Sequence, residues 1–206
     1  MSAKQDILNR IRSAQKQAGL PDHVDVPREY QRKGTLNDDE LREMLVDRLE
    51  DYKAEVHVTE ESDLKKTLDT IVNDRNCKDI RYAPGMNADL FDGLPARPDD
   101  EDADPRELDD ADAVVTESFV SSAQTGTIVL QSDSRCGRRA LTLVPDRHIC
   151  IVRRDEIVYG IPEVISRMNP EKPATWISGP SATSDIELAR VEGVHGPRDL
   201  IVLIVK

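Results

Sequence analysis

The amino-acid sequence predicts an α/β protein built on a mostly parallel sheet. Two observations carry this prediction. Residues 36–83 alternate helix, strand, helix and strand, which is typical of a right-handed parallel unit. Beyond residue 112, short runs of apolar β-forming residues follow one another, and their near-continuous apolar character suits strands that are covered on both faces.

The first 35 residues are expected to lie outside this domain. Five apolar residues recur there at helical spacing and predict an amphipathic helix: Ile7, Leu8, Ile11, Ala14 and Ala18. Residues 21–35 are polar and show no period, so we interpret them as a connector. The predicted organisation is an N-terminal helix and connector in residues 1–35 and an α/β domain in residues 36–206.

In the first half of the domain, Asn37 and Glu40 form a capping box that opens a helix with Leu41, Leu45 and Leu49 on one face. A short strand is expected around Val56 and Val58. A second helix is expected from Ser62, followed by a strand at Asp79–Ala83 that ends at Pro84 and Gly85.

In the second half, strands dominate. They are predicted at Ala113–Thr116, Thr127–Leu130, Leu141–Val144, Ile149–Val152, Ile157–Val158, Ala174–Ile177 and Leu200–Val205. A helix is expected from Pro162, a residue that suits the first helical turn. A short helix is expected at Ile186–Val191.

The charge of the chain limits its partners. Lys and Arg total 28 against 40 Asp and Glu, which gives a net charge of −12. This balance excludes broad binding to nucleic acid, and 3% aromatic residues exclude a base-stacking platform. Residues 98–112 alone hold nine acids and one arginine, and we expect them to form an exposed loop. The rest of the chain is only mildly acidic.

Three features predict a cytoplasmic protein that does not insert into membranes. No apolar stretch approaches the roughly 20 residues that span a bilayer. The first twelve residues are polar and lack an apolar signal core. Cys77, Cys136 and Cys150 are widely spaced and odd in number, so they suit a reducing compartment and match neither a disulfide framework nor a zinc pattern.

A first candidate site follows the strand predicted at Ala113–Thr116. Glu117 comes just past it, where sites on open α/β sheets usually lie, and we predict it to be catalytic. Thr125, Gly126 and Thr127 form a small, hydroxyl-rich loop that lets a backbone approach an anionic or carbonyl-bearing ligand closely. The alternative is an ordinary turn with a solvated glutamate.

A second candidate segment contains Gly179, Ser181 and Thr183, which lead from a strand into the helix predicted at residue 186. A helix N-terminus offers free N–H groups to a phosphate or carboxylate, so we predict these three residues to bind a ligand. The alternative is that the hydroxyls only cap the helix. Asp185 would also repel an anion placed there.

A third candidate segment is residues 193–198. His195 lies between glycines, where its imidazole can titrate or accept a proton, and we predict it to be catalytic. Gly196 and Arg198 are predicted to bind a ligand, with Arg198 as a clamp for carboxylate or phosphate. The alternative is a structural loop. No set of metal ligands is predicted anywhere in the chain.

Four segments together resemble the lactate-utilization (LUD) domain family, specifically its short members. They are residues 124–130, 143–148, 178–181 with 185–187, and 193–198. The resemblance covers roughly Asp112 to the C-terminus, and residues 1–111 match only in their helix–strand order. Gln124 stands where the family commonly has an acidic residue, so the resemblance assigns no acid–base role to this position.

The resemblance implies a three-layer α/β/α sandwich similar to glucosamine-phosphate isomerase, ribose-phosphate isomerase and CoA transferases. It also implies a part in oxidising L-lactate to pyruvate beside two partner proteins that carry iron–sulfur clusters. The cysteines agree, because three scattered thiols cannot supply a four-thiolate cluster site. We therefore expect no cofactor in this chain.

Two other functions stay open. One is a stand-alone enzyme or binder of a small anionic metabolite, such as a sugar phosphate, a CoA ester or a folate-like compound. In that case Glu117, Thr125, Ser181, His195 and Arg198 would line one cleft, and we expect the three candidate loops to converge. The other is a pure scaffold.

Overall fold

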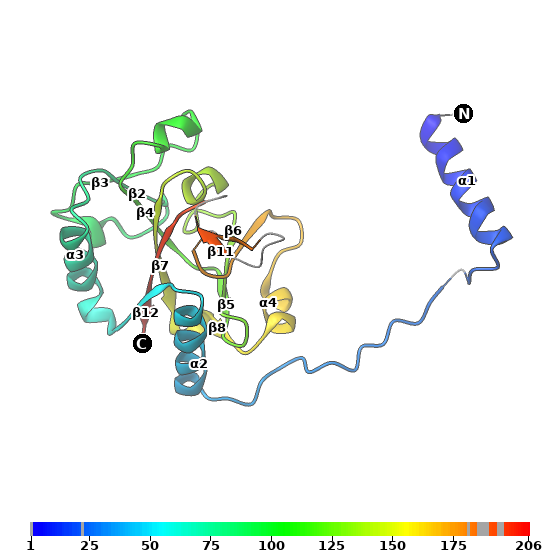
Figure 1. The fold of residues 1–206 in the computed structure, drawn as a ribbon, viewed down its shortest axis with the longest axis horizontal. Coiled ribbons are helices and arrows are strands. Elements are labelled where there is room, and N and C mark those ends of the chain that lie inside the picture. The colour runs from blue at the N-terminus through cyan, green and yellow to red at the C-terminus, as the bar shows by residue number, and fades with distance from the viewer. Residues whose placement is uncertain (1, 22, 181, 185–189, 193–195) are drawn as a thin grey trace. The chain divides into compact units, whose positions relative to one another are not determined.

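The computed structural model describes residues 2–21, 23–180, 182–184, 190–192 and 196–206, with residues 182–184 and 190–192 described by their backbone alone (Figure 1). The chain divides into two compact units, Met1–Gln31 and Arg32–Lys206. The first unit contains helix α1 (Ala3–Gln17), which begins after Ser2, whose hydroxyl accepts a hydrogen bond from the Gln5 backbone N–H. The N-terminal helix is thus present as predicted.

The second unit is built on a six-stranded sheet in which every pair of neighbours is parallel. The order is β1-β12-β7-β4-β2-β3. The strands are β1 (Glu55–Thr59), β2 (Ile80–Tyr82), β3 (Ala96–Pro98), β4 (Ala113–Glu117), β7 (Arg147–Arg153) and β12 (Asp199–Val205). The central strands are buried along almost their whole length, which confirms the prediction from their continuous apolar runs.

A second, four-stranded sheet has the order β8-β5-β6-β9. Its strands are β5 (Val120–Ser122), β6 (Thr127–Gln131), β8 (Ile157–Val158) and β9 (Ala174–Ile177). β6 runs antiparallel to both β5 and β9. Two further strands, β10 (Ala182–Ser184) and β11 (Arg190–Glu192), form a separate antiparallel pair.

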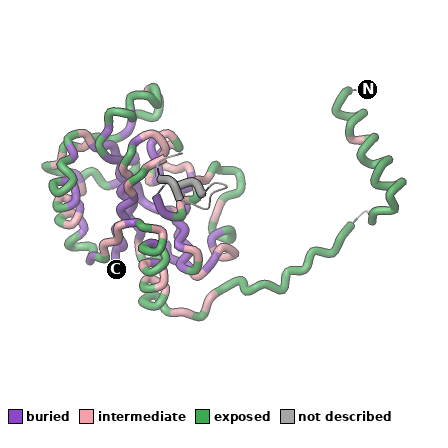
Figure 2. Tube along the Cα trace, viewed as in Figure 1, coloured by how far each residue is buried: buried purple, intermediate pink, exposed green. Residues whose placement is uncertain are grey.

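Helices and the second sheet cover the two faces of the main sheet. Helix α3 (Leu64–Asp74) packs on one face through Leu68 and Ile71. Helix α2 (Asp38–Asp51) packs on the other face together with the second sheet, and its capping box at Asn37 is confirmed. Helix α4 (Ile161–Arg167) packs on the second sheet through Val164. Figure 2 shows that the buried residues concentrate in the sheets between these helices.

Two local predictions were wrong. The strand expected at Leu141–Val144 is a 3-10 helix, η4 (Arg139–Thr142), because a four-residue apolar run does not distinguish a buried strand from a buried turn of helix. In place of the helix expected at Ile186–Val191, Arg190–Glu192 forms strand β11. The remainder of that predicted helix, at residues 186–189, lies outside the described residues.

The acidic segment 98–112 is exposed at most positions, but it is anchored at Asp99 and Leu108, which are buried. It contains the 3-10 helix η3 (Pro105–Leu108). The other 3-10 helices are η1 (Glu61–Asp63), η2 (Ala88–Phe91) and η5 (Arg154–Glu156).

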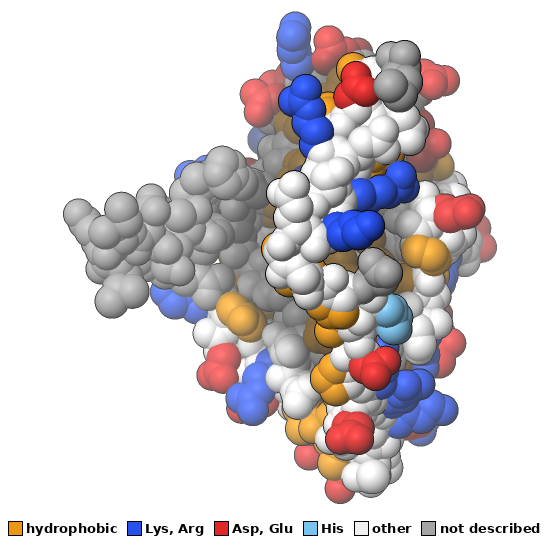
Figure 3. All heavy atoms as spheres, turned by 90° about the vertical axis from the view of Figure 1, so that its right-hand side faces the viewer, with side chains coloured by type: hydrophobic (Ala, Val, Ile, Leu, Met, Phe, Trp, Pro, Cys, Tyr) orange, Lys and Arg blue, Asp and Glu red, His pale blue; other side chains and the backbone are white. Residues whose placement is uncertain are grey.

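Lys and Arg side chains mix with Asp and Glu side chains on the face drawn in Figure 3. Among the described residues, no helix has the length and apolar character that crossing a membrane requires.

Candidate functional site

Glu117 is the last residue of β4 and lies at the carboxyl edge of the main sheet. Its neighbour strand β7 ends at Arg153 on the same edge, because the two strands are parallel. The Glu117 side chain is only 8% exposed, so its charge needs partners inside the protein. The structure supplies two arginines for it.

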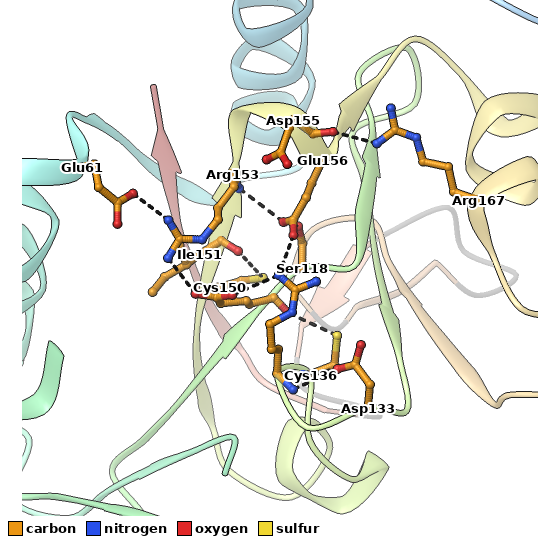
Figure 4. Close-up of polar contacts among 12 residues, drawn as sticks. Glu61, Ser118, Asp133, Cys136, Cys150, Ile151, Arg153, Asp155, Glu156 and Arg167 are labelled. Atoms are coloured by element: carbon orange, nitrogen blue, oxygen red, sulfur yellow. Dashed lines mark hydrogen bonds and ion pairs between the residues drawn. The ribbon is translucent and has the colours of Figure 1, made fainter. Parts of the chain in front are cut away.

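Arg153 and Arg135 each bind one oxygen of the Glu117 carboxylate. Arg153 Nη2 donates to Glu117 Oε1 at 2.9 Å, and Arg135 Nη1 donates to Glu117 Oε2 at 3.3 Å. Arg153 Nη1 also donates to Glu61 Oε2 at 2.6 Å, as Figure 4 shows. The Arg153 guanidinium group therefore bridges a buried carboxylate and an exposed one, since the Glu61 side chain is 63% exposed.

A second buried carboxylate, Glu156, belongs to the same cluster. Its Oε1 accepts from Arg135 Nη1 at 3.0 Å. Its Oε2 accepts from Ser118 Oγ at 2.7 Å, as Figure 4 shows. Burial raises the pKa of Glu156, and the hydrogen bond from Ser118 and the charge of Arg135 oppose that rise. We call Glu61, Glu117, Arg135, Arg153 and Glu156 the carboxyl-edge cluster.

The loop after β6 positions Arg135. Asp133 Oδ1 accepts hydrogen bonds from the backbone N–H groups of Arg135 (2.9 Å) and Cys136 (2.8 Å), which fixes the turn. The Arg135 carbonyl in turn accepts from the Glu117 N–H at 3.1 Å. The arginine thus comes from a turn 18 residues beyond Glu117 in the chain.

A recess of about 240 Å³ opens beside the carboxyl-edge cluster. Glu117 and Arg153 form part of its wall, and the N-terminal end of α3 and the turn around η2 form the rest. The full lining is Glu61, Leu64, Lys65, Asn87, Asp89, Leu90, Glu117 and Arg153. The recess therefore combines two basic groups, three acidic groups and two leucines.

The hydroxyl-rich loop, residues 125–127, follows the C-terminal end of β5, whereas Glu117 precedes the N-terminal end of β5. Thr125 Oγ1 lies 2.8 Å from both Ser122 Oγ and Thr127 Oγ1, and Thr127 Oγ1 lies 2.9 Å from Ser178 Oγ. The structure thus brings Thr125 and Thr127 to the start of the second candidate segment, where Gly179 follows Ser178. No hydrogen bond or ion pair among the described residues joins these hydroxyl side chains to Glu117.

Gly126 turns the chain between Thr125 and Thr127 with a φ of +59°. A Cβ at this position would lie 2.7 Å from Arg48 Cβ on α2. The glycine therefore serves a close approach of the turn to the helix, and ligand contact is not needed to explain it.

Arg198 lies at the opposite edge of the sheet. It comes just before β12 and donates to Asp146, just before β7, with Nε–Oδ1 at 2.6 Å and Nη2–Oδ2 at 2.7 Å. In the register of β7, Asp199 pairs with Arg147 and Glu117 with Ile151, so about 13 Å of strand separates the two ends. The structure does not bring Arg198 to Glu117.

Four other predicted positions offer little geometry. Ser181 and His195 lie outside the described residues. Thr183 is described only by its backbone, which pairs with Val191 in the β10–β11 hairpin. Gly196, which precedes Arg198, has a positive φ of 128°. The roles assigned to these residues stay predictions.

Arg153 was missed in the sequence, although a signal for it exists. It comes just past a predicted strand, as Glu117 does, and the carboxyl ends of neighbouring parallel strands meet at one edge. Arg135 and Glu156 carried no such signal, because each comes from a connection whose path depends on tertiary packing.

The cysteines do not form a ligand set. Cys77 packs in the core on the α3 face of the sheet, whereas Cys136 and Cys150 pack in the core on the other face. Burial raises the pKa of the Cys136 thiol and raises that of Cys150 to about 12, so neither favours the thiolate that binds metals. Within the described ranges, no group of three His, Cys, Asp or Glu side chains is placed to hold a metal ion.

Comparisons with known proteins agree with this architecture. The chain is 41% identical over 171 residues to lactate utilization protein C of Deinococcus radiodurans, covering 81% of this chain and 80% of that protein. It is 29% identical to lactate utilization protein C 1 of Bacillus mycoides, over 82% of this chain and 81% of that one.

A solved structure is also similar. The crystal structure of a DUF162 family protein from Deinococcus radiodurans matches with a TM-score of 0.70 and 34% identity, over 83% of this chain and 99% of that chain. The family model of the LUD domain matches residues 42–205, which include both sheets and the carboxyl-edge cluster. The chain therefore belongs to the LUD domain family.

Proposed function

We propose that this chain acts in lactate utilization, as a subunit of an L-lactate-oxidising complex whose iron–sulfur clusters reside on partner proteins. The observation that carries the proposal is the 41% identity to a lactate utilization protein C across four-fifths of both chains. The relatives' names supply the process, and the oxidation of L-lactate to pyruvate is our extension of it.

The thiol chemistry of the chain supports the place of the clusters in this proposal. A cluster needs four thiolates that converge, and this chain has three cysteines divided between two faces of a sheet. All three are free thiols, which suits a reducing compartment, so a cytoplasmic location is part of the proposal.

Within such a complex, the carboxyl-edge cluster is the part of this chain best suited to a substrate. It lies where open α/β sheets bind ligands, and it places charged side chains beside a recess. Glu117 contributes a buried carboxylate, although both of its oxygens accept from arginines, so proton transfer through Glu117 requires an arginine to move. The catalytic roles of Glu117 and His195 are part of the proposal.

The proposal is tested by a clean deletion in the organism that encodes the chain. Growth on L-lactate as the carbon source should fail, growth on glucose should not change, and the wild-type chain supplied in trans should restore growth on lactate. Affinity purification of the tagged chain should recover proteins that bear iron–sulfur clusters, recognised by their visible absorption. Normal growth of the deletion on lactate would remove the proposal.

A second candidate function is a stand-alone enzyme or binder of a small anionic metabolite. The positive charges of Arg153 and Lys65 beside the recess favour it, because they can hold an anionic group. The purified chain would then be stabilised by its ligand without partner proteins, which thermal unfolding measures. A sugar phosphate, a CoA ester and a folate-like compound are the probes, and no stabilisation by any of them at millimolar concentration would leave this candidate without support.

A further inference from the structure

Arg153 joins two carboxylates that differ sharply in exposure. The Glu117 side chain is 8% exposed and is also held by Arg135. Separating it from Arg153 would leave a buried carboxylate without part of its counter-charge, which costs free energy. The Glu61 side chain is 63% exposed and belongs to the three-residue 3-10 helix η1, and among the described residues its carboxylate is hydrogen-bonded to Arg153 alone. Exposed ion pairs of this kind contribute little free energy, so Glu61 is the partner that exchanges.

The recess meets Arg153 on this exposed side. Lys65 lines it as well, and its ammonium group donates to the carbonyls of Leu90 (3.3 Å) and Asp92 (2.5 Å), which leaves one of its three N–H donors. Leu64 and Leu90 supply apolar lining. The recess thus offers positive groups for an anionic head and an apolar wall for a short carbon chain.

We propose that a small monocarboxylate binds in this recess by taking the place of Glu61 on Arg153. A carboxylate has the planar two-oxygen geometry that a guanidinium group recognises, and the ligand then reproduces the bond that Glu61 gives up. The volume of about 240 Å³ lies below that of pockets for drug-sized ligands, so the ligand has only a few carbon atoms.

The charges of the recess favour one negative charge over two. Glu117 and Asp89 line it together with Glu61, against Arg153 and Lys65. A phosphate dianion would add a second negative charge beside a buried carboxylate, which costs free energy at short range. A monocarboxylate adds only the charge that Glu61 already places on Arg153.

The test uses isothermal titration of the full purified chain with sodium L-lactate, pyruvate and propionate, and with lactamide and inorganic phosphate as probes that lack the required head group. The choice of L-lactate rests on the proposed function, whereas propionate tests the geometry alone. The carboxylates should bind, and lactamide and phosphate should not. Phosphate binding as tight as that of propionate would overturn the inference.

Two variants, each with a neighbouring control, locate the site. Glu61→Gln removes the competing carboxylate and should tighten carboxylate binding up to about fivefold, the equivalent of one exposed ion pair. Glu60→Gln, which alters an exposed pair with Lys206, should leave the affinity unchanged. Equal affinities of these two variants would overturn the exchange.

Arg153→Lys keeps the charge, loses the planar fork and should weaken carboxylate binding by roughly tenfold or more. Arg154→Lys, which alters an exposed pair with Asp38, should bind as the wild type does. If Arg153→Lys does not fold, the Glu61→Gln comparison decides. Because binding is measured on the chain alone, normal growth of a deletion strain on lactate would remove the proposed function and leave this result standing.

Discussion

Arg138 holds Asp99 through two parallel hydrogen bonds, with Nε–Oδ2 at 2.7 Å and Nη2–Oδ1 at 3.0 Å. The Asp99 side chain is 1% exposed. Arg138 Nη1 also donates to the Ala103 carbonyl at 2.7 Å. One arginine from the loop after β6 therefore fastens the beginning of the acidic segment 98–112 to the body of the domain.

Arg138→Gln should destabilise the protein by about 3–5 kcal/mol, because it leaves the Asp99 carboxylate buried without its counter-charge. Urea unfolding followed by circular dichroism measures the change in the free energy of unfolding. Arg139→Gln, at the next position, is the control and should change it little. Equal losses in the two variants would show that the ion pair does not anchor the segment.

The acidic segment illustrates what sequence patterns can predict. Composition correctly indicated that most of its side chains are exposed, because charge density is a local property. It could not indicate that Asp99 is buried, because the partner that makes this possible lies 39 residues away.

The same limit applies to the candidate site. Alternating helix and strand patterns predicted the parallel sheet, and the sheet placed Glu117 at the expected edge. Arg153 could be predicted by the same rule. The contacts of Arg135 and Glu156 depend on how the β6–η4 loop and η5 pack over β4, and no local pattern encodes that packing.

Gly126→Ala tests whether the hydroxyl-rich loop is held by packing. At φ +59° an alanine is strained, and its Cβ would also lie 2.7 Å from Arg48 Cβ. We expect the free energy of unfolding to fall by about 1–3 kcal/mol more than the backbone strain alone would cause. Gly93→Ala is the control, since Gly93 has a φ of +86° and no atom within 4 Å of the added Cβ, so it should show the strain alone, about 1–2 kcal/mol. Equal losses in the two variants would contradict a close approach to α2.

The burial of His148 predicts that the protein loses stability in mild acid. His148 belongs to β7, and its buried imidazole has Nε2 2.8 Å from Thr116 Oγ1 on β4. Burial lowers its pKa to about 4 from the usual 6.5. As the pH falls below 6.5, the unfolded chain takes up a proton that the folded protein does not. The free energy of unfolding should therefore fall by about 2 kcal/mol between pH 7 and pH 5 from this group.

The difference between His148→Asn and the wild type isolates that contribution. Between pH 7 and pH 5, the free energy of unfolding of His148→Asn should fall by about 2 kcal/mol less than that of the wild type. His23→Asn, at an exposed position, should follow the wild type. Parallel pH profiles for wild type and His148→Asn would show that His148 is protonated in the folded protein.

Glu156 predicts a pH dependence of the opposite sign. Burial raises its pKa in the folded protein above the usual 4.5, so the unfolded chain releases the proton first as the pH rises. The contribution of Glu156 to the free energy of unfolding is therefore largest below pH 4.5 and is lost as the pH rises through the folded pKa. Glu156→Gln cannot lose a proton, so its stability relative to the wild type should improve with rising pH over this range.

Urea titrations from pH 4 to pH 7 measure the difference, with the exposed neighbour Asp155→Asn as control. A gap that stays constant, or that widens in favour of the wild type, would show that the carboxylate is stabilised by Arg135 and Ser118 more strongly than burial penalises it.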